Sequence, residues 1–228
     1  MCSSSLPPQY HVVETTFACA GNPLVLTHVD DTNALLDAIT PEDFARDERL
    51  PYWAEVWASG IALGEFCLAE SSLGGKRVLE LGCGVGIAGI AAAQNGAEVV
   101  MTDYEPDALE FARWNAARNL TGALPEFHLL DWRRPSDLGR FDMILGADVI
   151  YDRANFLPLL QTIDRSLHPE GEVILSDPER HTAGSFLELA RTNGFRSLSW
   201  RTLVHHRERE VEVSIHRLHR WGSTGCKT

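Results

Sequence analysis

Residues Arg77 to Gly89 read Arg-Val-Leu-Glu-Leu-Gly-Cys-Gly-Val-Gly-Ile-Ala-Gly. The segment from Val78 to Leu81 is mostly apolar and lies between glycines, which predicts a short, buried strand. Glycines follow at alternate positions, and the run from Ile87 to Ala93 then predicts a compact helix. A strand that turns through glycines into a helix lets the backbone approach a ligand at the positive end of the helix. The stretch therefore predicts a site for a nucleotide-type cofactor.

The glycine spacing is compatible with two kinds of cofactor. Residues 84–89 match the G-x-G-x-x-G pattern of dinucleotide sites, and Asp103 lies near the position expected for an acid that binds ribose. Glu80, however, stands at the strand end, two residues before Gly82. A carboxylate there would repel the pyrophosphate of NAD, whereas it suits the sulfonium and ammonium of S-adenosylmethionine (SAM). The pattern Glu-x-Gly-x-Gly-x-Gly over 80–86 resembles motif I of class I SAM-dependent methyltransferases, although Glu80 could also cap the following loop.

Length and composition set broad limits on function. The 228 residues suffice for one large domain or two small ones. The formal net charge of −12 argues against binding to nucleic acid, which needs Lys and Arg clusters, and is compatible with a cationic substrate such as a lysine side chain. Five scattered cysteines, no signal peptide and no long apolar run predict a cytoplasmic protein that does not bind membranes. The nine histidines lack the spacing of a metal site, so no metal is expected.

Downstream of the glycines, predicted strands and helices alternate. The strands span 98–102, 126–130, 141–147 and 172–176, and the helices span 106–119, 156–167 and 183–192. Two last strands, 195–203 and 211–218, flank a charged loop at 205–210, which predicts one antiparallel edge strand. The expected fold class is α/β: a Rossmann-like, seven-stranded, mostly parallel sheet with helices on both faces, as the resemblance to class I methyltransferases also implies.

The N-terminal part follows a different pattern. Residues 10–29 predict a β-hairpin around 21–23, and residues 32–46 have helical character that is broken at Thr40-Pro41. A further helix is expected at 61–68, where apolar residues share one face. We therefore divide the chain into an N-terminal extension, residues 1–50, and a methyltransferase domain, residues 51–228.

Polar or aromatic residues stand at the carboxyl end of each predicted parallel strand, where ligands bind in open α/β sheets. Asp103 would accept hydrogen bonds from ribose hydroxyls, whichever cofactor is bound. Trp132 could cover the adenine, and Asp131 or nearby backbone could bond its amine. Each acid could instead cap the next helix or turn, and Trp132 could be a core residue. The full set is Glu80, Asp103, Asp131-Trp132, Asp148 and Asp177.

Residues 145–152, Leu-Gly-Ala-Asp-Val-Ile-Tyr-Asp, contain a second informative pattern. Asp148-Val-Ile-Tyr151 resembles the D-x-x-Y signature of the seven-strand lysine methyltransferases called methyltransferase family 16. Other matches to that family lie between Tyr52 and Ile174, in the same order along the chain. The resemblance implies that SAM is the cofactor and that it is contacted by Trp57, Gly82, Cys83, Gly84, Asp103, Trp132 and Ala147, with Glu80 beside its cationic groups.

The resemblance implies transfer of the SAM methyl group to an amine nitrogen, most simply that of a lysine in a protein substrate. Asp148 would hold the amine, and Tyr151 would shape the slot and face the cation. Whether Asp148 or water accepts the proton stays open. So do three alternatives: a small-molecule N-methyltransferase acting on a nicotinamide-like amine, an NAD-dependent oxidoreductase, and a non-catalytic SAM-binding module. The hairpin and residues 176–181 lie outside the resemblance, and substrate choice is expected to depend partly on them.

Overall fold

The computed structural model describes residues 6–19, 22–37, 50–134 and 137–222. A seven-stranded sheet has the order β5-β4-β3-β6-β7-β9-β8, so the strand order reverses beside β3. Its strands are β3 (Arg77–Leu81), β4 (Glu98–Asp103), β5 (Glu126–Leu129), β6 (Phe141–Ala147), β7 (Leu167–Asp177), β8 (Phe195–His206) and β9 (Arg209–Arg220). The five strands from β3 to β7 are parallel. The expected α/β fold is confirmed.

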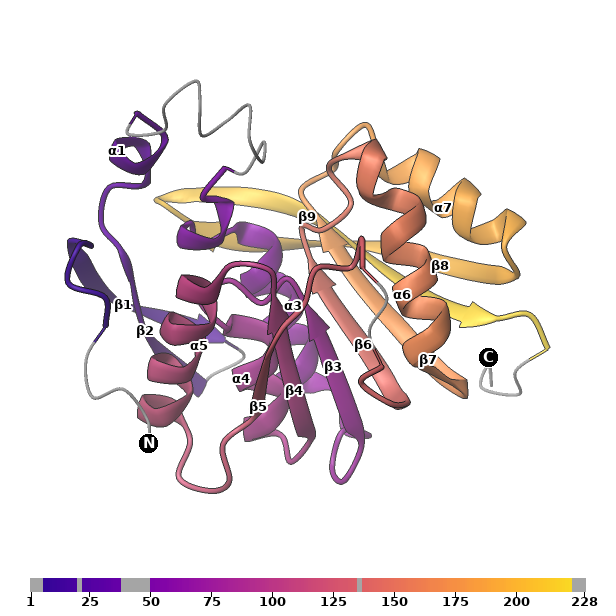
Figure 1. Ribbon diagram of the computed structural model, residues 1–228, viewed down its shortest axis with the longest axis horizontal. Helices are drawn as coiled ribbons and strands as arrows, with labels where there is room; N and C mark the ends of the chain where they lie inside the picture. Colours follow the sequence, from indigo (N-terminus) through magenta and orange to yellow (C-terminus); the bar gives the residue numbers. More distant parts are fainter. Residues whose placement is uncertain (1–5, 20–21, 38–49, 135–136, 223–228) are drawn as a thin grey trace.

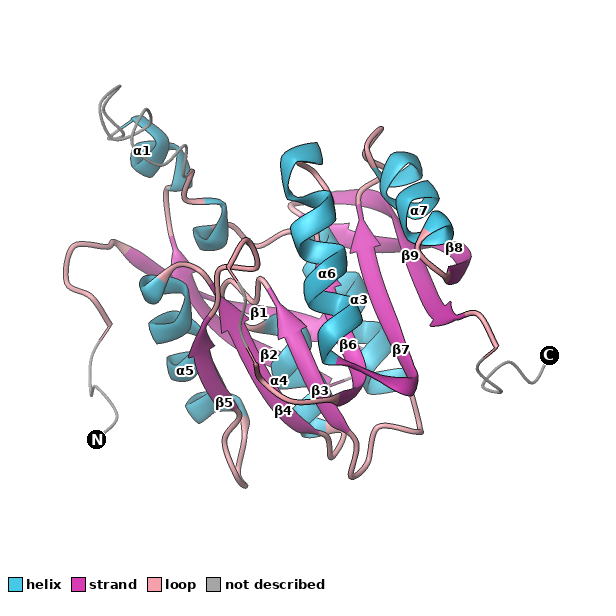
Figure 2. Ribbon diagram, turned by 45° about the vertical axis from the view of Figure 1, so that its right-hand side comes forward, coloured by secondary structure: helices cyan, strands magenta, loops and turns pink. Residues whose placement is uncertain are grey.

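Helices cover both faces of the sheet, as Figures 1 and 2 show. They are α3 (Ala58–Ala69), α4 (Ile87–Gln94), α5 (Pro106–Asn119), α6 (Phe156–Ser166) and α7 (Ala183–Thr192), with the 3-10 turns η1 (Tyr52–Ala54) and η2 (Arg153–Asn155). Neighbouring strand residues point to opposite faces, as the pleat requires. Val78 joins the core formed with α3, α4 and α5, whereas Leu79 joins the core formed with α6 and α7.

The antiparallel pairing lies at one edge of the sheet. β9 runs antiparallel to both β7 and β8, so β8 forms the edge and the reversed strand lies one position inside it. The charged segment 205–210 is mostly strand: His205 pairs with Glu210, His206 pairs with Arg209, and only Arg207 and Glu208 form the turn. Both turn residues have positive φ, 50° and 60°, as in a tight two-residue hairpin. The charged residues 205–210 therefore belong mostly to β8 and β9, and their charge alone did not predict a loop correctly.

The N-terminal hairpin is held by two asparagines of α5. Its strands are β1 (Val12–Cys19) and β2 (Asn22–Val29), followed by the short helix α1 (Thr32–Asp37). Asn115 accepts a hydrogen bond from Thr27 N (2.8 Å) and donates to Thr27 O (3.0 Å) and to Val85 O (2.9 Å). Asn119, one turn later, bonds the backbone of Val25 in the same two-way manner (2.9 and 2.8 Å). Asn115 thus links the hairpin to the loop after β3.

The hairpin also shares the core of the larger sheet, because Leu24 and Leu26 are fully buried within the core cluster beside α5. The division of the chain at residue 50 stays a prediction. The expected helix break at Thr40-Pro41, and the helical character up to Arg46, lie outside the described residues.

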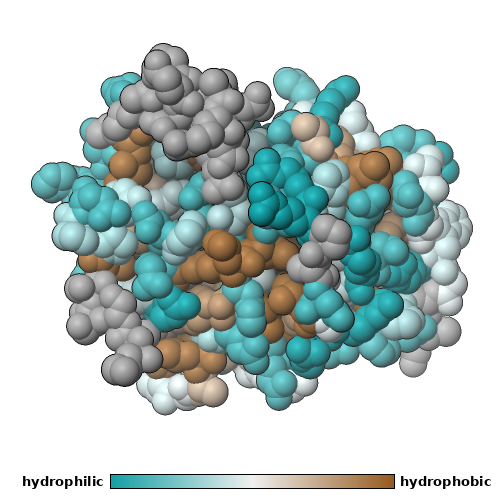
Figure 3. All heavy atoms as spheres, viewed as in Figure 1, coloured by the Kyte–Doolittle hydropathy of each residue, from teal (hydrophilic) through white to brown (hydrophobic). Residues whose placement is uncertain are grey.

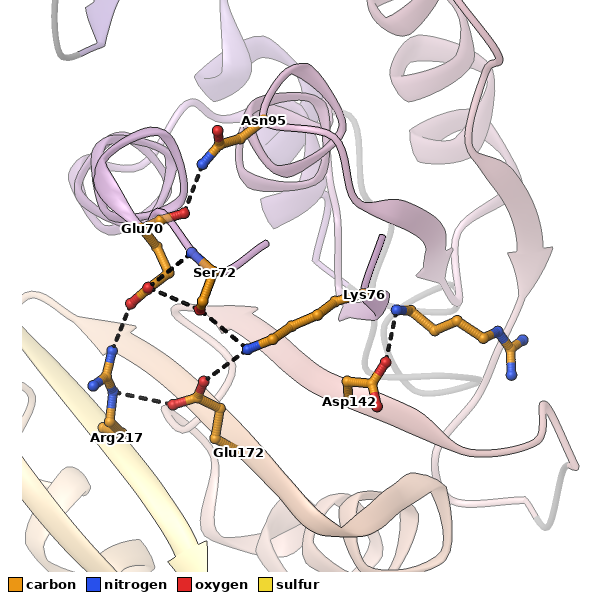
Figure 4. A network of polar contacts seen from close by, with 8 residues as sticks. Glu70, Ser72, Lys76, Asn95, Asp142, Glu172 and Arg217 are labelled. Atoms are coloured by element: carbon orange, nitrogen blue, oxygen red, sulfur yellow. Dashed lines mark hydrogen bonds and ion pairs between the residues drawn. The ribbon is translucent and has the colours of Figure 1, made fainter. Parts of the chain in front are cut away.

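A polar network ties the sheet together at the end opposite the carboxyl ends of the parallel strands (Figure 4). Arg217 of β9 donates a hydrogen bond to Glu70 after α3 (3.0 Å) and forms an ion pair with Glu172 of β7 (3.2 Å). Lys76, just before β3, contacts Glu172 (3.6 Å) and donates to Ser72 (3.1 Å). These contacts join α3, β3, β7 and β9. They lie away from the carboxyl ends of the parallel strands, where a ligand can bind.

The face in Figure 3 has hydrophobic residues gathered near its centre and hydrophilic residues around them. At one edge of the sheet, Leu129 of β5 is 62% exposed.

Among the described residues, no helix combines the length and the apolarity needed to cross a membrane.

Candidate functional site

The loop between β3 and α4 is shaped by glycines with positive φ. Gly84 has φ 51°, and a Cβ there would lie 3.1 Å from the carbonyl oxygen of Trp53. Gly86 has φ 96°, and a Cβ there would lie 2.9 Å from Met101 Cε. L-residues rarely adopt such φ values, so the loop conformation depends on glycine. It brings the backbone of residues 82–84 to the carboxyl end of β3, at the wall of a cavity.

Glu80 is 2% exposed and lines this cavity from inside β3. Its Oε2 accepts a hydrogen bond from the backbone N of Gly89 (3.1 Å), in the first turn of α4. Burial raises the pKa of Glu80 to about 8, and the nearby Asp103 charge adds to that rise, against the Gly89 hydrogen bond. Glu80 therefore bonds a backbone N–H in the first turn of α4, whereas the alternative left open from the sequence had it cap the loop before that helix. A cation bound beside this carboxyl group would lower its pKa again and favour the ionised form.

The pKa of Glu80 makes stability depend on pH. Since the folded protein holds this proton more tightly than the unfolded chain, whose carboxyl group has a pKa near 4.5, the stability that Glu80 contributes falls as pH rises from about 4.5 to about 8. Glu80→Gln keeps the shape without the ionisation. We expect its free energy of unfolding, relative to wild type, to rise across this window by up to about 1.4 kcal/mol per pH unit. Denaturant unfolding at several pH values measures this, and parallel curves for the two proteins would contradict it.

Gly89 has no room for a side chain. A Cβ there would collide with Glu80 Oε2 and lie 2.9 Å from Met101 Cε. We expect Gly89→Ala to destabilise the protein by about 1–3 kcal/mol, the usual cost of an overpacked core. The control is Gly184→Ala in α7, where the position is exposed and a Cβ would meet nothing within 4 Å. That change should be neutral or stabilise by roughly 0.5–1 kcal/mol, since alanine is the better helix former. Equal denaturation midpoints for both variants would refute the assigned packing.

Asp103 ends β4 beside the glycine loop and is 4% exposed. Its Oδ2 accepts from Gly84 N (2.9 Å), and its Oδ1 accepts from Glu105 N (3.0 Å). Burial raises the pKa of Asp103 against these hydrogen bonds. The backbone N of Tyr104 also bonds this carboxylate, and because a carboxylate can accept about four hydrogen bonds, capacity is left for a ligand. The carboxylate therefore organises the loop and also lines the cavity.

Trp132 and Trp57 are among the aromatic residues that line the cavity. The Trp132 ring passes 3.7 Å from the position that a Cβ of Gly82 would take, so the indole stands over the glycine loop. Trp57 comes just before α3, and its Nε1 donates to Tyr52 O (2.9 Å). Ala147, at the end of β6, completes this side of the wall. An aromatic face, two acids and the backbone of the glycine loop form a site that suits a nucleoside.

Asp148 and Tyr151 follow β6 and line the same cavity. Asp148 has φ 54°, a left-handed conformation that Asp and Asn tolerate better than most residues. Its carboxylate accepts two hydrogen bonds from Arg180, from Nε to Oδ1 (2.5 Å) and from Nη2 to Oδ2 (2.7 Å). Burial raises the pKa of the Tyr151 phenol, whose ring packs edge-on against Tyr52 at 5.6 Å between centroids.

The cavity thus brings together all ten residues selected from the sequence: Trp57, Glu80, Gly82, Cys83, Gly84, Asp103, Trp132, Ala147, Asp148 and Tyr151. The other two acids at strand ends, Asp131 and Asp177, bond side chains that do not belong to this set of ten. Asp131 bonds Arg133 (2.8 and 3.0 Å), and Asp177, fully buried, bonds His216 (2.6 Å). The described residues contain no group of three or more His, Cys, Asp or Glu side chains placed to hold a metal.

The structure also places at the site residues that sequence reasoning did not select, among them three aromatic residues and an arginine. Tyr52, Trp53 and Tyr104 line the cavity, and Arg180 lines the hollow beside Asp148. Tyr52 and Trp53 belong to the aromatic segment that leads into α3, which was a signal in the sequence. Arg180 lies within residues 176–181, the stretch that the resemblance did not cover, and no local pattern connected it with Asp148.

Comparison with known proteins places these features in a family. A sequence model described as lysine methyltransferase matches residues 46–192. Protein N-lysine methyltransferase METTL21A of Danio rerio is 40% identical over 136 residues, which are 57% of this chain and 62% of the relative, less than two thirds of its length. EEF1A lysine methyltransferase 3 of Mus musculus is 32% identical over 175 residues, 74% of this chain and 73% of the relative.

Solved structures share the fold. N-methyltransferase NodS from Bradyrhizobium japonicum, in complex with S-adenosyl-L-homocysteine, has a TM-score of 0.60 at 17% identity and covers 84% of this chain and 100% of that chain. Magnesium protoporphyrin IX methyltransferase from Synechocystis PCC 6803, with bound SAM, has a TM-score of 0.57 at 20% identity and covers 84% of this chain and 98% of that chain. At these identities the likeness concerns the fold.

Proposed function

The chain belongs to the lysine methyltransferase family, a family of SAM-dependent enzymes, and on that premise we propose that it transfers a methyl group from SAM to the side-chain nitrogen of a lysine in a protein. The observation that carries the proposal is one cavity whose two ends differ in chemistry. Glu80, Asp103 and the glycine loop form the end suited to a nucleoside that carries positive charge. Asp148 and Tyr151 form an acidic and aromatic end suited to an alkylammonium.

The described lining of the cavity fits SAM better than a dinucleotide. It includes Glu80 and Asp103 and contains no Lys, Arg or His, the side chains that would neutralise a pyrophosphate. The alternative of an NAD-dependent oxidoreductase is therefore disfavoured. In the proposed arrangement Asp103 holds the ribose hydroxyls, Trp132 covers the adenine, and Glu80 lies beside the cationic part of the cofactor. Trp57, Cys83 and Ala147 complete its surroundings.

SAM supplies a methyl group on a sulfonium, which is a good leaving group, so the protein mainly has to position and desolvate the amine. A lysine amine, with a pKa near 10.4 in water, must lose a proton before it can attack. Asp148 would orient this amine by a hydrogen bond, and the Tyr151 ring would pack against its carbon chain. The proton passes to Asp148 or to water. We also propose a cytoplasmic location, with which the free, buried thiol of Cys83 agrees.

Binding and label transfer test the proposal. We expect calorimetry to show binding of SAM and of S-adenosylhomocysteine, and none of NAD, because the cavity wall is acidic. Incubation with methyl-labelled SAM and cell lysate should then label protein. Label in small molecules alone would favour the small-molecule N-methyltransferase, and SAM binding without label would favour a non-catalytic module. NAD binding without SAM binding would refute the whole proposal.

A further inference from the structure

The proposed acceptor end already contains a cation. Beside the main cavity lies a hollow lined by Tyr52, Trp57, Asp148, Tyr151 and Arg180. The guanidinium carbon of Arg180 lies 5.7 Å from the ring centre of Trp57 and 5.8 Å from that of Tyr151. Its Nε and Nη2 bond both carboxylate oxygens of Asp148, at 2.5 and 2.7 Å. Aromatic faces around a carboxylate form a cation site, and Arg180 occupies it.

Arg180 also controls access to Asp148. The Asp148 side chain is 4% exposed, whereas that of Arg180 is 34% exposed. Two cations held side by side on one carboxylate would repel each other. A protonated amine therefore bonds Asp148 more tightly once the guanidinium has left.

The backbone around Arg180 is anchored, so the side chain is the part that can move. Arg180 N donates to Asp177 Oδ1 (2.6 Å), and the other oxygen of Asp177 bonds buried His216. Two residues later, Thr182 Oγ1 donates to Ile150 O (2.8 Å). Rotation about the side-chain bonds of Arg180 can vacate the site without shifting this loop.

We propose that Arg180 is a resident substitute for the substrate lysine: it fills the acceptor site of the free enzyme and leaves Asp148 when an alkylammonium enters. This inference rests on the proposed function and adds a selectivity device to it. A small free amine must compete with the ion pair between Arg180 and Asp148. Because both partners belong to one chain, Arg180 has a high effective concentration at Asp148. A protein lysine can offset that competition through the contacts of its flanking residues. The gate thus selects against small amines.

The test measures binding of n-butylamine, an analogue of the lysine side chain, by calorimetry in the presence of S-adenosylhomocysteine. We expect Arg180→Ala to bind it about tenfold or more tightly than wild type, because the competing cation is gone. The matched control is Arg201→Ala. The side chain of Arg201 is 64% exposed and pairs with Glu179 (2.6 Å), the residue just before Arg180. This variant therefore removes a nearby charge without opening the site. It should bind butylamine as wild type does.

A second variant covers the case in which Arg180→Ala fails to fold. Arg180→Lys keeps a cation and places a primary amine near Asp148. Once this amine loses its proton to solvent, its nitrogen can bond the methyl carbon as the carbon–sulfur bond of SAM breaks, which leaves S-adenosylhomocysteine. We expect the purified variant to gain the mass of a methyl group on incubation with SAM, whereas wild type gains none.

The outcomes separate this inference from the proposed function. Equal butylamine affinity for Arg180→Ala and wild type, or equal gains for Arg180→Ala and Arg201→Ala, would overturn the gate. So would a folded Arg180→Lys protein that binds SAM and gains no mass. Tighter butylamine binding by Arg180→Ala, without label transfer by wild type to any lysate protein, would support the gate and contradict the proposed function.

Discussion

Asp148→Asn is expected to lower methyl transfer by about a hundredfold or more, as other lost electrostatic contacts to a transition state do. The carboxylate would stabilise the cationic amine while it is held and while charge redistributes during transfer. Asn keeps the size and one acceptor oxygen and removes the charge. It also tolerates the φ of 54° at this position, so the loop after β6 should keep its conformation. The acceptor for the rate measurement is the protein labelled in the lysate experiment.

The specific expectation is that SAM affinity changes little, because Asp148 stands at the acceptor end of the cavity beside Arg180. Tyr151→Phe is the graded control: it keeps the ring that packs against Tyr52 and should reduce the rate less than Asp148→Asn does. Loss of SAM binding in proportion to loss of activity would assign Asp148 to the cofactor site. Full activity of Asp148→Asn would remove it from the mechanism.

Asp103→Ala is expected to weaken SAM binding by roughly 2–4 kcal/mol, about 30- to 1000-fold, for the loss of two charge-assisted hydrogen bonds to the ribose. The structure adds a further reason, because Asp103 also bonds Gly84 N at 2.9 Å and so holds the glycine loop in place. Calorimetry with SAM measures the loss, and circular dichroism checks that the fold survives. Unchanged affinity would leave Asp103 with the capping role alone.

Local patterns were sufficient for much of the fold. The bounds of α5, β6 and α7 agree with those expected from the sequence, since Pro106 starts α5 and Asn193-Gly194 follows the end of α7. The glycine loop could likewise be predicted from residues that are close in the sequence. The same holds for the alternation of helices and strands and for the residues at the strand ends. Because the carboxyl ends of parallel strands meet at one edge, residues chosen one strand at a time were expected to converge on one cavity, and they do.

Where strand pairing extends beyond its hydrophobic centre, the sequence was less informative. Strand β7 begins at Leu167, five residues before the expected start, and its first residue pairs with Phe141 across a register shift. The turn between β8 and β9 contains two residues where a longer charged loop was expected. In both segments the backbone is held by hydrogen bonds to a neighbouring strand, and exposed polar side chains leave little periodic signal of that pairing.

The sequence by itself determined the class of fold, the glycine loop and the acids at the strand ends, because these follow from local backbone geometry and from the period of burial. Only the tertiary structure decided which distant groups meet. Asn115 holds Thr27, 88 positions away, and Arg180 bonds Asp148, 32 positions away, through the loop after β7. Such pairs depend on the order of strands in the sheet and on the turns after them, and that order arises from the packing of the whole chain.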